Sequence, residues 1–188
     1  YILVPRDPAD FDLLVDSLRP APRATDIDVV IGVKGPLVPP DFASGLILPL
    51  VVFDQLYSFD IDSLINGIPR PDGMSAEEFE PAAEDLYNRI AQIADNAGST
   101  DEHRALNYLA VRYPAIYAEA ARALGRNSTI SAVRARPSRL SGARKIVDVI
   151  FLFRNRNTDV EDSFFVRIDV TEEFPFLVTK LSPYYERK

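Results

Sequence analysis

The sequence predicts an α+β domain, in which a mainly antiparallel sheet has a small set of helices packed on one side. In residues 163–171, every second residue from Phe164 to Val170 is apolar, as in a strand with one buried face. Residues 145–153 are apolar on both faces, which is typical of a central strand covered on both sides. Because about ten residues connect the two segments, we expect them to pair as antiparallel neighbours. We also expect the N-terminal strands to join this sheet.

The N-terminal part of the chain is predicted to contain two short strands and one helix. Residues 1–4 and 27–33 have the apolar, β-branched composition of strands. Residues 11–18 carry apolar side chains at helical spacing and are followed by Pro20, before which the helix should end. After the second strand, the dipeptide at residues 35–36 is Gly-Pro, which predicts a rigid turn.

Residues 46–59 are ambiguous between strand and helix. Their apolar density suits a buried strand, but Pro49 disfavours both a central strand and an uninterrupted helix. We therefore expect an extended start followed by a helical turn. Asp60 or Asp62 should then cap a short helix through Ile65.

The middle of the chain predicts three helices that pack together. Ser75 and Glu78 form a capping box at the start of the first helix, and Gly98 stands where a left-handed C-terminal cap belongs. Its predicted buried face repeats every three or four residues: Phe79, Ala83, Leu86, Ile90, Ile93 and Ala97. The second helix should begin at residue 100 or 101, and the third at Pro114, with Gly125 closing it.

Length and composition suit one globular domain over residues 1–188. Because the sequence starts without Met, we expect it to be a piece of a longer protein or to lack its first residues. The chain contains no cysteine, and it lacks an apolar run near the roughly 20 residues of a membrane span. We therefore expect no disulfide, no membrane association and a cytoplasmic location. The net charge of −7 is uneven, because residues 1–121 are acidic and residues 122–188 are basic. This asymmetry indicates either an anion-binding face or two halves with matched surfaces.

Enzyme motifs are missing from the sequence, and we expect no cofactor and no metal. There is no Gly-x-Ser-x-Gly elbow and no phosphate-binding loop of the Gly-x4-Gly-Lys-Ser/Thr type. His103 is the only histidine, and we expect it to be exposed in the first turn of a helix. Residues 155–161 resemble a calcium loop only superficially, because Val160 and Val166 occupy the positions of the required Gly and Glu. We interpret that segment as a turn between strands.

A basic segment is the first candidate binding site. Arg134, Arg136, Arg139 and Arg144 lie in or beside a turn-rich loop, and arginine forks bind carboxylates and phosphates through paired hydrogen bonds. The loop could therefore bind an acidic peptide or another acidic ligand. The alternative is that these arginines pair across strands within the chain. Nucleic acid is disfavoured by the pI of about 4.8.

Three charged residues in the predicted strands are candidates for buried pairs. Asp148 interrupts an apolar strand face, so it requires an Arg, a Lys or several donors. Arg134 or Arg167 should meet Asp148 or Asp169. A carboxylate-dependent enzyme that uses Asp148 and Asp169 remains the alternative function.

Several unusual strings in the chain carry a resemblance to a known family. Residues 136–142, 154–159 and 169–178, together with residues 1–8 and 52–60, are similar to one domain of unknown function. That domain lies at the C-terminal ends of PatA- and PatG-type proteins of cyanobactin biosynthesis. The resemblance implies that residues 1–188 are the C-terminal module of a larger protein. It also implies that a separate subtilisin-like domain of this host protein cuts or cyclises a ribosomal precursor peptide. The catalytic residues of that protease domain have no counterparts here.

From motifs and resemblance together we expect a non-catalytic accessory domain of cyanobactin maturation. Its expected partners are a second copy of the chain, the precursor peptide or other pathway proteins. The expectation of a two-fold homodimer rests partly on residues 174–178, whose apolar side chains exceed what three short helices can cover.

Overall fold

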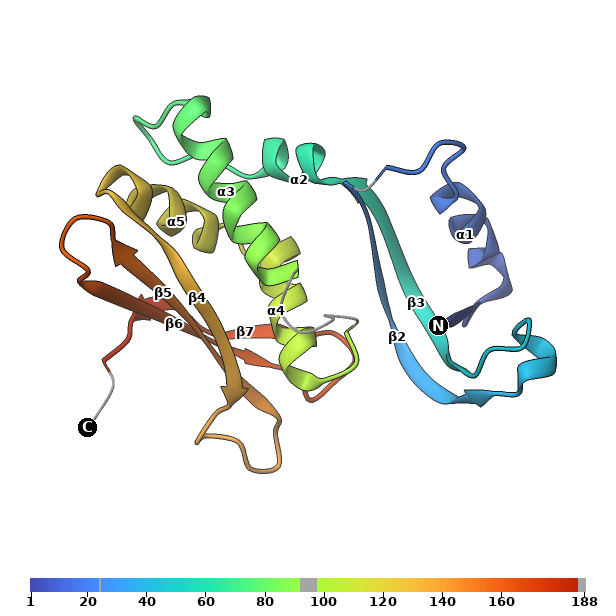
Figure 1. Cartoon of the computed structure of the whole chain (residues 1–188). Helices are drawn as coiled ribbons and strands as arrows, with labels where there is room; N and C mark the ends of the chain where they lie inside the picture. Colours follow the sequence, from blue (N-terminus) through green and yellow to red (C-terminus); the bar gives the residue numbers. More distant parts are fainter. Residues whose placement is uncertain (24, 92–97, 186–188) are drawn as a thin grey trace. The chain divides into compact units, whose positions relative to one another are not determined.

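A computed structural model describes residues 1–23, 25–91 and 98–185 (Figure 1). The chain divides into two compact units, residues 1–63 and residues 64–188. Strands and helices occur in both parts of the sequence, so the α+β class is confirmed. The strands form two separate sheets, however, and the N-terminal strands do not extend the C-terminal sheet as we expected. One domain over the whole chain stays a prediction.

The first unit contains a three-stranded sheet in the order β1-β3-β2. Its strands are β1 (Ile2–Pro5), β2 (Asp26–Val38) and β3 (Leu48–Asp60). Strand β1 runs parallel to β3, whereas β2 is antiparallel to it. Short 3-10 turns at Pro8–Asp10 and Pro40–Phe42 precede α1 and β3 respectively. The strands that we predicted at residues 1–4 and 27–33 are therefore confirmed.

Helix α1 (Phe11–Ser17) is confirmed, but its apolar side chains are not buried. Phe11, Val15 and Leu18 are 58%, 50% and 76% exposed. The periodicity of the sequence predicted the helix correctly, yet within the described residues little of this unit covers its apolar face.

Residues 46–59 correct our expectation of a helical turn, because β3 is extended from Leu48 to Asp60. The decisive influence is pairing with the distant strand β2, which continues along almost the whole length of β3. Pro49 lies near the start of β3, opposite Leu37 and beyond a register shift. The next helix, α2 (Ile61–Gly67), is capped by Asp60, whose Oδ1 accepts from the amide of Ser63 over 2.7 Å.

The predicted turn at residues 35–36 is absorbed into β2 as an irregularity between Lys34 and Leu37. Another register shift follows Ile31, and there the backbones approach closely at Gly32. A Cβ atom on Gly32 would lie 2.4 Å from the carbonyl oxygen of Val52. Only glycine fits there without a backbone shift.

The second unit contains α3 (Ala76–Ala91), α4 (Asp101–Arg112) and α5 (Ala115–Gly125). The capping box is confirmed: the amide of Glu78 donates to Ser75 Oγ, and the amide of Ser75 donates to Glu78 Oε2. The predicted inward residues Phe79, Ala83, Leu86 and Ile90 are all buried. The predicted positions 93 and 97 lie outside the described residues. No helix of the described ranges is long and apolar enough to cross a membrane.

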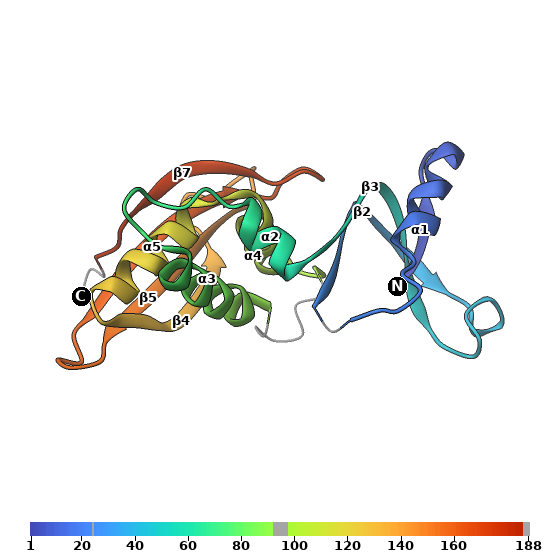
Figure 2. The same ribbon diagram turned by 90° about the horizontal axis from the view of Figure 1, so that it is seen from above.

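These helices pack on one face of an antiparallel four-stranded sheet (Figures 1 and 2). Its strands, in spatial order, are β4 (Ser128–Pro137), β5 (Ile146–Asn155), β6 (Glu161–Asp169) and β7 (Phe176–Pro183). Strands β5 and β6 pair with Val149 opposite Val166, so the predicted antiparallel neighbours are confirmed. Both valines are fully buried, as expected for the face that the helices cover.

Tyr117 anchors α5 to α4 inside this core. Its hydroxyl donates to the carbonyl of Ala110 over 2.6 Å. Burial, with a smaller contribution from Tyr87, raises the pKa of Tyr117, so the phenol stays protonated and keeps this hydrogen bond.

Candidate functional site

The charged residues singled out by the sequence gather around the sheet face opposite the helices, which we call the outer face. The strand ladder places Asp148 of β5 directly opposite Arg136 of β4 and Arg167 of β6. Arg167 Nε donates to Asp148 Oδ1 over 2.9 Å, and its guanidinium lies 4.8 Å from the centre of the Phe165 ring. Because Asp148 is only 8% exposed, this ion pair offsets the cost of burying its carboxylate.

Arg136 binds an aromatic side chain rather than a carboxylate. One of its terminal nitrogens donates to the Tyr184 hydroxyl over 2.7 Å, and the guanidinium lies 5.8 Å from the centre of that ring. The Tyr184 ring meets Phe165 edge-on, with the two centroids 5.7 Å apart. Since Arg136 belongs to β4 and Phe165 to β6, Tyr184 reaches across β5 and covers part of the outer face.

Asp169 is fully buried at the end of β6. Arg144 Nε lies 2.5 Å from Asp169 Oδ2, and the amide of Thr171 donates to Oδ1 over 2.8 Å. Burial alone would raise the pKa of Asp169, but the hydrogen bonds from Thr171 and the charge of Arg144 lower it below its ordinary value. The Arg144 guanidinium also lies 5.1 Å from the centre of the Phe176 ring. Asp169 is therefore held as a carboxylate.

Arg134 and Arg139 differ from the other candidates, because neither makes a hydrogen bond or ion pair with any part of the chain that the structure describes. Both side chains are exposed. Arg134 lies on the outer face, opposite Ile150 in the ladder, and Arg139 lies in the loop between β4 and β5. Of the four arginines predicted to bind a ligand, these two keep their guanidinium groups available.

The loop that carries Arg139 is held at its base by hydrogen bonds. The amide of Ser138 donates to the carbonyl of Ile146 over 2.7 Å. The hydroxyl of Ser141 donates to the same carbonyl and accepts from the amide of Ile146. The base of the loop is fixed, while Arg139 and its exposed neighbour Leu140 project from it.

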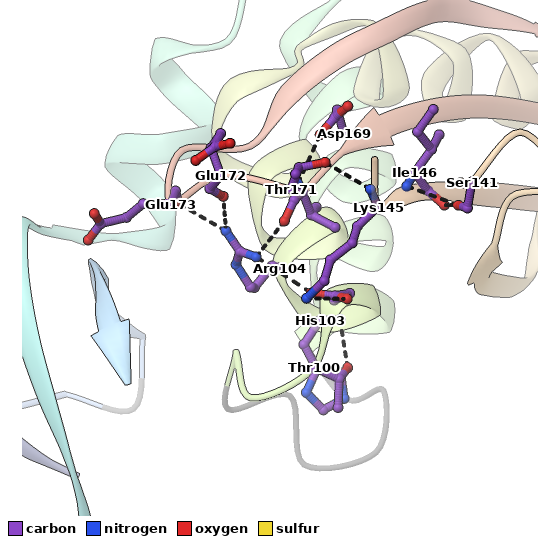
Figure 3. Close-up of polar contacts among 12 residues, drawn as sticks. Thr100, His103, Arg104, Ser141, Lys145, Ile146, Asp169, Thr171, Glu172 and Glu173 are labelled. Atoms are coloured by element: carbon purple, nitrogen blue, oxygen red, sulfur yellow. Dashed lines mark hydrogen bonds and ion pairs between the residues drawn. The ribbon is translucent and has the colours of Figure 1, made fainter. Parts of the chain in front are cut away.

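Arg104 connects α4 to the loop between β6 and β7 (Figure 3). Its guanidinium donates to the backbone carbonyls of Val170 over 2.7 Å and of Glu173 over 3.0 Å, and also to that of Glu172. Nearby, the amide of Lys145 donates to the Thr171 hydroxyl over 2.8 Å. This network fixes the segment that places Asp169, so its role is structural support.

His103 stands in the first turn of α4, as predicted, but it is half-buried rather than exposed. Its backbone amide donates to the hydroxyl of Thr100, which caps the helix. Its Nδ1 atom is buried and has no hydrogen-bond partner among the described residues. The neighbouring Lys145 ammonium is bound by Asp101 at 3.3 Å.

The described residues contain no group of three His, Cys, Asp or Glu side chains that could hold a metal ion. A hollow of about 300 Å³ lies between α3, α5 and the start of β4, lined by Asp85, Arg89, Ser128 and Arg156 among others. None of the seven site residues predicted from the sequence lines this hollow. The predicted residues therefore form an arginine-bearing surface around the outer face.

Two residues that make important contacts were not singled out by the sequence analysis: Tyr184, which covers part of the outer face, and Arg104 of α4, which holds the loop between β6 and β7. Tyr184 lies after the last strand, where no pattern shows that it folds back across β5. Arg104 resembles any helical arginine, and its carbonyl partners are more than 60 residues away in the sequence. For Tyr184, the nearest signal in the sequence was the aromatic composition of the C-terminal segment. This composition indicated an apolar surface but not where it would lie.

Comparisons with known proteins agree with the sequence resemblance. A family model described as PatG C-terminal matches residues 73–184. That range includes residues 136–142, 154–159 and 169–178, so the resemblance is confirmed. Among solved structures, the chain is similar to a "PatG Domain of Unknown Function", with 17% identity and a TM-score of 0.64, over 97% of this chain and 75% of that one. At this identity the likeness shows the fold alone. A search of curated proteins found no match.

Proposed function

The chain belongs to the PatG C-terminal family, and we propose that it is a non-catalytic accessory module of cyanobactin maturation that binds a peptide or protein partner. We place this module in the cytoplasm. In this function, other domains of the host protein carry out the cutting or cyclising step.

The observation that carries the proposal is that each of the two candidate carboxylates forms an ion pair with an arginine. Asp148 is bound by Arg167, and Asp169 is bound by Arg144 and Thr171. The pKa of Asp169 is lowered, whereas a general acid–base catalyst works best with a pKa near the operating pH. Both arrangements favour structural ion pairs over the carboxylate-dependent enzyme that was our alternative.

The unpaired arginines support binding of an acidic partner segment. Arg134 and Arg139 expose planar guanidinium groups, which bind carboxylates through two parallel hydrogen bonds. Arg136 and Arg144 are already engaged, by Tyr184 and by Asp169. We therefore assign recognition to the first pair and positioning of the surface to the second.

Two measurements on the full chain test the proposal, with a synthetic cyanobactin precursor peptide as the probe. The mass of the peptide should remain unchanged after incubation. Reproducible cleavage or cyclisation that is lost in Asp148→Asn would overturn the non-catalytic assignment.

The fluorescein-labelled peptide should bind in an anisotropy titration. The double variant Arg134→Gln/Arg139→Gln should weaken binding about tenfold, since each lost charged hydrogen bond contributes roughly 1.5–3 kcal/mol at most and exposed groups contribute less. Arg112→Gln is the matched control, because Arg112 is exposed on α4 and makes no ion pair within the described residues. Absence of binding, or equal losses in both variants, would contradict the assigned surface.

A further inference from the structure

The first unit exposes more large apolar side chains than the rest of the described chain does. Among the described residues, twelve of the eighteen exposed large hydrophobic side chains lie in residues 1–63. In the same range, Phe53 is the single large side chain that is fully buried. A unit that leaves this much apolar surface in contact with water indicates an interaction surface.

Strand β2 offers an unpaired edge beside this surface. It is the outer strand of the order β1-β3-β2, and no described strand pairs with its other side. Strand β2 is regular from Asp26 to Lys34. The first register shift, after Ile31, arises from an extra residue in β3. The extra residue of β2 comes only after Lys34. Natural edge strands are commonly protected by proline, bulges or charges. The stretch from Ile27 to Val33 carries a single charge, that of Asp28.

The charges on β2 are complementary to those of a second copy of β2 that runs antiparallel to it. Asp28 and Lys34 are both exposed, and neither makes an ion pair or hydrogen bond within the described ranges. If two β2 strands pair antiparallel about a two-fold axis at Ile31, Asp28 of each copy lies opposite Lys34 of the other. Val29 then lies opposite Val33. Opposite charges and β-branched residues are favourable cross-strand pairs.

We propose that two copies of this chain associate through β2, antiparallel about Ile31, to form one continuous six-stranded sheet. Each interface residue is used twice, as a two-fold interface requires. The apolar row of Ile27, Val29, Ile31 and Val33 then continues into the same row of the second copy. This inference does not rest on the proposed function, because it concerns the first unit and not the outer face.

The location differs from the C-terminal strands that suggested a dimer from the sequence. Strand β7 is also an edge, but its register against β6 shifts twice and it carries Lys180. The amide of Leu181 is already bound by the hydroxyl of Tyr113 over 3.0 Å. These features protect β7 from strand addition.

Charge reversal tests the register in the full chain. Sedimentation across a concentration series should show a species of twice the 21.0 kDa mass of the chain. Asp28→Lys or Lys34→Asp alone should weaken association about tenfold, because each dimer then contains two like-charge pairs. The double variant should restore association to within about threefold. Lys180→Asp on β7 is the control and should change nothing.

Disulfide trapping tests the position of the two-fold axis at Ile31. Because the chain contains no native cysteine, any disulfide must form at the introduced residue. Directly opposed residues have Cα atoms about 4.5–5.5 Å apart, within the range of a disulfide. Ile31→Cys should therefore form a covalent dimer on oxidation. Val33→Cys should not, because the two copies of that residue would lie about 14 Å apart along the strands.

Three outcomes would overturn the proposal. The first is a wild-type chain that stays monomeric to high micromolar concentration, even if another protein binds β2. The second is a double charge variant whose loss of dimerisation affinity equals the combined losses of the two single variants. The third is equal trapping of Ile31→Cys and Val33→Cys, although Val33 is 50% exposed and the more accessible position.

Discussion

Asp169 illustrates how a buried carboxylate is retained in a sheet. Its side chain is fully buried, yet Arg144 and Thr171 both contact it, and Arg144 remains mostly exposed to water. The guanidinium therefore keeps much of its hydration while it neutralises the buried charge. Such an arrangement avoids the full desolvation of two ions that makes buried salt bridges costly.

Replacing Asp169 by Asn should destabilise the chain by about 2 kcal/mol at pH 7, because a buried charged acceptor is lost. The pKa of Asp169 is lowered in the folded chain from its ordinary value of 3.8, so its contribution is present above pH 3.8. It is lost as the pH falls through the lower, folded-state pKa. Urea unfolding of both proteins at pH 7 and at lower pH should show the difference shrinking.

Asp162→Asn serves as the control for this experiment, because Asp162 is an exposed carboxylate of the same strand. It should change the free energy of unfolding by less than about 0.5 kcal/mol. A difference between wild type and Asp169→Asn that stays constant with pH would contradict the ionised, paired carboxylate.

The partners of individual charges could be predicted from the sequence only in part. Asp148 was expected to need a cation, and the ladder supplies Arg167 from the neighbouring strand. Asp169 was expected to meet Arg134 or Arg167, but its cation is Arg144, which comes from a loop. Cross-strand partners follow from register, whereas the conformation of a loop is not encoded in a two-residue repeat.

Strands were predictable where their pattern was local. Residues 163–171 alternate with a period of two, and β6 appears at Glu161–Asp169, close to the predicted bounds. Residues 46–59 gave no such pattern, and β3 exists because β2 pairs with it. Long-range pairing overrides local propensity, so Pro49 misled the prediction.

Arg104 is expected to control the attachment of the loop between β6 and β7. Three carbonyls accept from its planar guanidinium, and a lysine ammonium at the end of a different stem cannot reproduce that geometry. Arg104→Lys should therefore lower the free energy of unfolding by roughly 1–3 kcal/mol. Hydrogen exchange should also become faster at residues 170–173.

Arg112→Lys on the same helix provides the comparison, because Arg112 is exposed and makes no ion pair among the described residues. Its free energy of unfolding should match that of the wild type. If Arg104→Lys behaves like Arg112→Lys, the three carbonyl contacts do not stabilise the loop.

At the scale of the whole chain, the two units differ in how much core each possesses. The second unit has a sheet covered by three helices, with Leu86, Leu109, Val149 and Ile168 fully excluded from water. In the first unit, the apolar side chains of α1 are exposed, and Phe53 is the one large side chain among the described residues that is fully buried. A domain near 60 residues is marginal even when its core is well formed.

This contrast predicts that the units behave differently when they are separated. A fragment of residues 64–188 should unfold in a single cooperative thermal transition, with a near-ultraviolet circular dichroism signal from its packed aromatic residues. A fragment of residues 1–63 should gain such a transition only at high concentration, because pairing through β2 would supply the apolar cover that it lacks. Its midpoint temperature should rise with concentration, and Asp28→Lys should move that rise to about tenfold higher concentration. A transition that does not depend on concentration would instead mean that residues 1–63 form a core large enough to fold by themselves. The prediction that they need a partner at β2 would then be wrong.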